Sequence, residues 1–82
     1  MDENRLAVVA IIAKSADCSE RVNALLHEFG AYIVGRMGLP YREKSVNIIS
    51  VVLDAPAPVI NGLTGKLGMI EGVSAKALYS SK

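Results

Sequence analysis

The residues best suited to chemistry lie in one short segment, residues 36–44. It holds two arginines, a lysine and a tyrosine around a glycine and a proline. Guanidinium groups donate hydrogen bonds in a planar fork that matches carboxylates and phosphates. For a small anionic ligand, the expected contacts are therefore Arg36, Tyr41 and Arg42. The preferred interpretation of the segment is nevertheless a solvated hairpin tip, in which the arginines pair with Glu43 or with a neighbouring subunit.

His27 and Cys18 are the two soft metal ligands of the chain. They stand nine residues apart in an expected helix, so they point to opposite sides at about 100° per residue. Zinc and similar ions need three or four protein ligands, which only several subunits together would supply. We expect no metal site and no cofactor, and a solvent-facing His27.

No catalytic constellation is evident. Nucleophilic catalysis needs an activated serine, cysteine or lysine beside a positioned base. The one histidine is expected on a helix surface without a companion. The loop Lys14-Ser15-Ala16 lacks the arginine and glycines of an anion-cradling acylphosphatase-like loop. We therefore expect no enzyme and no catalytic residue.

Charge and composition exclude several partners. The formal net charge is +1, from nine basic and eight acidic residues, so no strong field attracts nucleic acid or an anionic membrane. The expected strands 6–13 and 46–53 carry no aromatic residue on which bases could stack. The apolar run 6–13 is too short to span a bilayer. A single cysteine allows no internal disulfide, which favours the reducing cytoplasm.

Six elements are expected to position these residues, in the order βαββαβ within one domain, residues 1–82. The expected strands are 6–13, 31–37, 46–53 and 73–79, and the expected helices are 18–29 and 59–68. Asp17 followed by Glu20 resembles a capping box for the first helix. This order predicts an α+β ferredoxin-like sandwich, in which a four-stranded antiparallel sheet carries two helices on one face.

Two glycines interrupt the second expected helix. Gly62 and Gly65 each cost about 1 kcal/mol of helix propensity relative to alanine, and they lie off its apolar stripe. We therefore expect a close neighbour on that side of the helix. The first helix is the preferred neighbour, and a partner subunit or a ligand is the alternative.

The first expected strand is apolar on both sides. Its alternating sets are Leu6, Val8, Ala10, Ile12 and Ala7, Val9, Ile11. Right-handed crossovers place both helices on one face of the sheet, so the opposite face remains an apolar patch. Such patches mark interfaces. We therefore expect a homodimer or homotetramer that forms through the sheet.

Three segments carry a family resemblance: Arg21–His27, Arg36–Glu43 and Leu63–Val73. They resemble the iron-only hydrogenase system regulators, over about residues 6–77. The resemblance implies an ACT-like, ferredoxin-like fold that is similar to the C-terminal domain of nickel-responsive repressors. Those repressors have a ribbon-helix-helix domain before the sandwich and several metal-binding histidines. This chain has only residues 1–5 there and one histidine, so we expect neither direct DNA binding nor nickel sensing.

Together these features predict a non-catalytic regulatory module that works as a homo-oligomer and binds a small ligand between subunits. The alternative is an adaptor whose open sheet docks a second polypeptide of a hydrogenase-maturation system, without a small ligand. Amino-acid binding stays open, because residues 14–17 lack the loop glycine that is usual in amino-acid-binding ACT domains.

Overall fold

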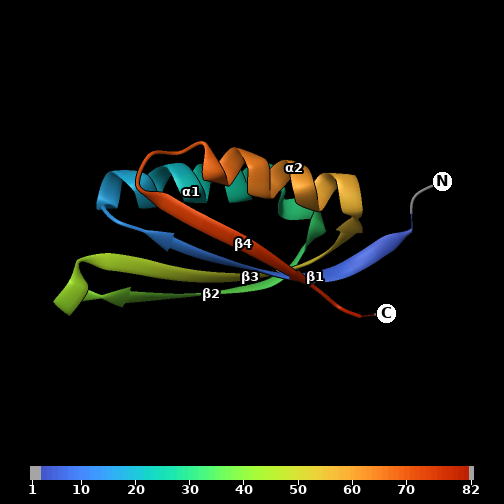
Figure 1. Ribbon diagram of the computed structural model, residues 1–82, viewed down its shortest axis with the longest axis horizontal. Coiled ribbons are helices and arrows are strands. Elements are labelled where there is room, and N and C mark those ends of the chain that lie inside the picture. Colours follow the sequence, from blue (N-terminus) through green and yellow to red (C-terminus); the bar gives the residue numbers. More distant parts are fainter. Residues whose placement is uncertain (1–2, 82) are drawn as a thin grey trace.

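The computed structural model describes residues 3–81, which form an antiparallel sheet with both helices on one face (Figure 1). The elements are β1 (Asn4–Ala13), α1 (Ala16–Glu28), β2 (Ile33–Tyr41), β3 (Val46–Pro56), α2 (Ala57–Gly68) and β4 (Val73–Tyr79). Short 3₁₀ turns, η1 (Gly30–Tyr32) and η2 (Arg42–Lys44), flank β2. The four strands lie in the order β2-β3-β1-β4. The predicted α+β ferredoxin-like fold is confirmed.

The hydrophobic core lies between the helices and one face of the sheet. Odd-numbered residues of β1 and β3 point to this face, because residues directly opposite in an antiparallel pair share a side. Most of the core side chains are 0–1% exposed: Ala7, Val9, Ile11, Ala13, Val51, Leu53 and Ala55 from the sheet, and Val22, Leu26, Ile60, Leu63 and Leu67 from the helices. The period of two in the strands therefore leaves all even-numbered residues of β1 on the other face.

The start and end of β2 differ from the prediction. The strand begins at Ile33, after the turn η1, and it continues through the expected stop to Tyr41, which pairs with Val46 of β3. Pro40 is tolerated within it because β2 is an edge strand of the sheet. The predicted loop is therefore half strand, and the β2–β3 hairpin is long.

The start of α1 also differs from the prediction. Ser15 is the N-cap, and its hydroxyl accepts a hydrogen bond from the backbone N–H of Cys18 at 3.2 Å. Asp17, the predicted cap, instead lies in the first turn of the helix. The hydroxyl of Ser15 thus satisfies one of the open N–H groups at the helix start.

The expected close neighbour of the α2 glycines is absent from the described chain. Among residues 3–81, a Cβ placed on Gly62 or Gly65 would meet no atom within 4 Å apart from its chain neighbours and the surrounding backbone of α2. The preferred explanation, close packing against α1, is therefore wrong. Both glycines lie on an open side of α2.

Candidate functional site

Two hydrogen bonds join the β2–β3 hairpin to α1. Arg36 lies opposite Val51 on the helix side of β2, and its guanidinium donates to Oδ1 of Asn23. Asn47, near the start of β3, donates through Nδ2 to Oγ of Ser19 at 2.6 Å. Ser19 and Asn23 stand four residues apart, so they occupy neighbouring turns on one side of α1. These bonds set the hairpin at a defined position beside the helix.

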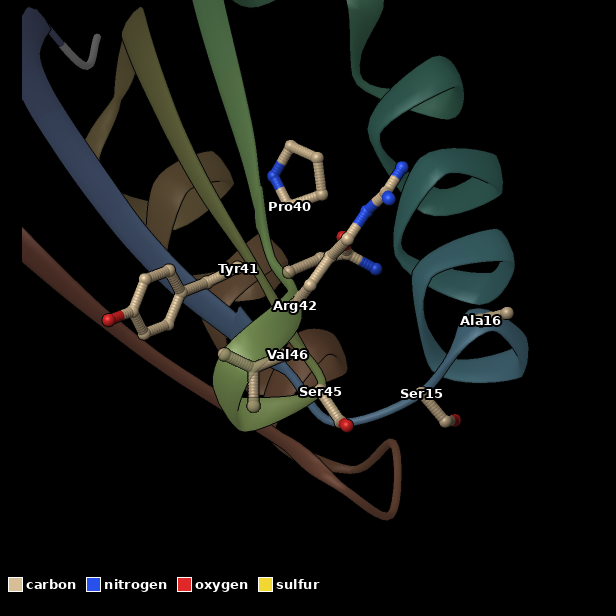
Figure 2. A pocket seen from close by; sticks show the side chains of 8 residues that line it. Ser15, Ala16, Pro40, Tyr41, Arg42, Ser45 and Val46 are labelled. Carbon is tan, nitrogen blue, oxygen red and sulfur yellow. The ribbon is translucent and has the colours of Figure 1, made fainter.

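A cleft with two lobes opens between α1 and this hairpin, and we call it the hairpin cleft. The larger lobe has a volume of about 320 Å³, and its polar lining is formed by Ser19, Asn23, Arg36 and Asn47. The smaller lobe has a volume of about 190 Å³ and lies beside Ser15, Ala16, Arg42 and Ser45 (Figure 2). Pro40 and Asn47 border both lobes, so the lobes are adjacent.

The three predicted ligand contacts do not share one face of the sheet. Arg36 lines the larger lobe, and the Arg42 side chain extends from η2 into the gap between the hairpin and α1 (Figure 2). The Tyr41 ring points the other way, and its hydroxyl donates to Oε1 of Glu43 at 2.9 Å. The structure thus brings the two arginines to one cleft. Tyr41 also borders the smaller lobe, but its ring turns away from it.

The amide and hydroxyl groups of the cleft were not predicted as site residues. Asn47 was visible in the sequence as a polar residue in an otherwise apolar strand. Ser19 and Asn23 have the four-residue spacing of one helix side, beside the buried Val22 and Leu26. That pattern marks a polar border of the apolar stripe, but it does not show which strand lies against it.

Cys18 has a packing role where α1 meets the turn before β4. Its half-buried thiol donates to the carbonyl oxygen of Glu71 at 3.1 Å. Gly72 has a φ of 87°, and a Cβ there would lie 2.8 Å from Sγ of Cys18. Gly72 is therefore required both by its backbone conformation and by the space that the thiol occupies.

His27 is exposed on α1, as predicted. Residues 3–81 contain no group of three or more histidine, cysteine or acidic side chains placed to hold a metal ion. Over the same residues, neither helix is long and apolar enough to cross a membrane.

The sheet face opposite the helices is apolar and exposed, as predicted, and we call it the open sheet face. Eight of its large side chains are 37–73% exposed: Leu6, Val8, Ile12, Met37, Leu39, Tyr41, Ile48 and Leu78. These side chains share one face of the four-stranded sheet and together form an exposed apolar surface. Contiguous apolar surfaces of this kind mark sites of interaction.

The TM1266-like family, described as "Iron-only hydrogenase system regulator, putative", matches residues 5–77 of this chain. The chain belongs to this family. The uncharacterized protein TM1266 from Thermotoga maritima is 37% identical to it, with a TM-score of 0.90 over 94% of this chain and 98% of that chain. The predicted family resemblance is thereby confirmed. No curated protein matches the sequence.

More distant structures share the fold alone. The C-terminal domain of the MgtC protein from Mycobacterium tuberculosis is 12% identical, with a TM-score of 0.75 over 98% of this chain and 92% of that domain. A formyltetrahydrofolate deformylase from Pseudomonas putida KT2440 is 15% identical, with a TM-score of 0.69 over 89% of this chain and 28% of the enzyme. The architecture is therefore ACT-like and ferredoxin-like, and it carries no information about activity.

Proposed function

We propose that this member of the TM1266-like family is a non-catalytic regulatory module that works as a homo-oligomer and binds a small anionic ligand. The family description supports the regulatory role. The open sheet face supports the homo-oligomer, and this observation carries the proposal. The two arginines of the hairpin cleft support the ligand.

The open sheet face fits a second copy of the chain, because it presents eight exposed large side chains on one surface. A stable protein interface buries about 800 Å² on each partner, and apolar side chains concentrate at the centre of such an interface. A two-fold axis places the same patch on both copies, so the patch must be complementary to itself.

The charges on the open sheet face are also compatible with a second copy. Side chains alternate between the two faces of a strand, which places Asp54 of β3 and Lys76 of β4 on the open sheet face. The two residues are exposed and carry opposite charges. Two copies related by a two-fold axis can therefore bring unlike charges together at the rim. A net charge of +1 adds little repulsion between copies.

The proposal that the module has no catalytic activity rests on the positions of its reactive groups. His27 is exposed near the C-terminal end of α1. Cys18 lies near the N-terminal end, where its thiol donates a hydrogen bond to the backbone carbonyl oxygen of Glu71. A nucleophile and its base must lie within hydrogen-bond reach of each other. This pair stands at opposite ends of a 13-residue helix, so it does not meet that requirement.

Light scattering on the purified protein over a range of concentrations tests the assembly. We expect a dimer or a tetramer whose mass falls only on strong dilution. A monomer at all concentrations contradicts the homo-oligomer. A monomer that forms a defined complex with a second polypeptide through the open sheet face would favour the alternative, an interaction adaptor without a small ligand.

A further inference from the structure

We infer that the hairpin cleft binds a small molecule with two acidic groups, such as a dicarboxylate, one group in each lobe. This inference rests on the proposed function, because it names the ligand class of the proposed module.

In the larger lobe, Arg36 is held in place without losing its charge. The hydrogen bond to Asn23 fixes the guanidinium against α1, but the acceptor is a neutral amide. Arginine has five N–H donors, so this bond leaves donors for a carboxylate. Asn47 uses one of its two amide N–H groups on Ser19. A carboxylate in this lobe would therefore meet a pre-oriented cation and polar side chains.

In the smaller lobe, Arg42 supplies a second positive charge. The neighbouring carboxylate of Glu43 accepts a hydrogen bond from Tyr41, whose ring points away from the cleft (Figure 2). That bond directs Glu43 toward Tyr41 and leaves the Arg42 side chain in the gap beside α1. The ion pair between an arginine and Glu43, considered from the sequence, is replaced by this tyrosine bond.

The size of the cleft sets the size of the ligand. Pockets for drug-sized ligands have volumes of about 300–1,000 Å³. Each lobe by itself, at about 320 and 190 Å³, falls at or below the lower end of this range, so each has room for one small acidic group. Pro40 and Asn47 border both lobes, so the lobes are adjacent, and each would hold one acidic group of the same molecule. Succinate and glutarate differ by one carbon, so their relative affinities report which spacing of the acidic groups suits the cleft.

The test is a titration of the full-length protein with succinate and glutarate, followed by the amide resonances of the ¹⁵N-labelled protein. Butyrate serves as the monocarboxylate of matched length, and sodium chloride keeps the ionic strength constant. We expect saturable shifts at Ser19, Asn23, Gly38 and Asn47. Butyrate is expected to bind about tenfold more weakly, because it loses one charge-assisted contact.

Variants of the arginines make the test specific. Arg36→Ala and Arg42→Ala are each expected to weaken dicarboxylate binding by about tenfold. Arg36→Lys keeps the charge but loses the fork, so its affinity should fall between Arg36→Ala and the wild type. Arg21→Ala is the matched control, because Arg21 is an exposed arginine that borders neither lobe. Arg42 lies in the exposed turn η2, so its removal leaves the core intact.

Equal affinities for succinate and butyrate would overturn the inference, as would no binding of either dicarboxylate at tens of millimolar. If Arg21→Ala loses as much affinity for succinate as Arg36→Ala does, the binding depends only on the overall positive charge. That result would also overturn the inference. Light scattering on the same samples separates the two proposals. An oligomer without dicarboxylate binding contradicts only the cleft, and a monomer that binds dicarboxylates contradicts only the assembly.

Discussion

A charge placed on the open sheet face should dissociate the oligomer. Leu78, on the edge strand β4, is 73% exposed and points away from the helices. In the variant Leu78→Lys, an ammonium group replaces this side chain. Because Leu78 is already mostly in water, we expect the free energy of unfolding of the single chain to change by no more than about 0.5 kcal/mol.

The expected effect on assembly is much larger. Full burial of a leucine side chain contributes about 1.5–3 kcal/mol, so burying the exposed 73% contributes about 1–2 kcal/mol per copy. A two-fold interface contains the residue twice, which gives about 2–4 kcal/mol in total. This corresponds to a rise of roughly 30- to 1,000-fold in the dissociation constant. Desolvation of the ammonium group adds to this rise.

Sedimentation velocity over a concentration series measures this dissociation constant. Met69→Lys is the matched control, because Met69 is 85% exposed but follows α2 instead of lying on the sheet. We expect Met69→Lys to assemble like the wild type and Leu78→Lys to run as a monomer over most of the range. If both variants assemble with wild-type affinity, β4 is not part of the interface, and the proposal that the copies meet through the open sheet face is contradicted at this strand.

Three further predictions concern the local structure, and urea unfolding tests each of them. Gly72→Ala should lower the free energy of unfolding by about 1–3 kcal/mol, because φ is 87° there, and by less in a Cys18→Ala background that frees the space of Sγ. Gly65→Ala should raise it by about 0.5–1 kcal/mol, since the new methyl group meets no atom; a loss would reveal a neighbour on that side of α2. Ser15→Ala should cost about 1 kcal/mol and Asp17→Ala less, because Ser15 caps α1; the reverse order would restore Asp17 as the cap.

Most of the fold was predictable because its elements have strong local signals. The strand 73–79 was predicted with the observed bounds, and the helix end at Gly68 was also correct. The first strand was placed correctly because an apolar run of β-branched residues is typical of a central strand. The errors lie at element ends, where local signals compete with tertiary pairing.

The site was only partly predictable, for a reason that β2 makes clear. Residues 38–40 contain a glycine and a proline, which locally favour a turn. Pairing with β3 overrides this preference and extends the strand to Tyr41. Side chains alternate along a strand, so Arg36 and Tyr41, five positions apart, must lie on opposite faces. If residues 38–41 formed a loop, as the sequence predicted, Arg36 and Tyr41 would not be required to lie on opposite faces of the sheet.

By itself, the sequence determined the architecture and the presence of a second apolar face. Both follow from periodicity, since a strand that is apolar at every position has two faces that avoid water, and two helices cover only one of them. Only the tertiary structure decided the hairpin cleft. Its polar side chains come from α1, β2, η2 and β3, and no local pattern shows which of these elements lie side by side. That proximity results from the strand order and from the hairpin length, which non-local pairing sets.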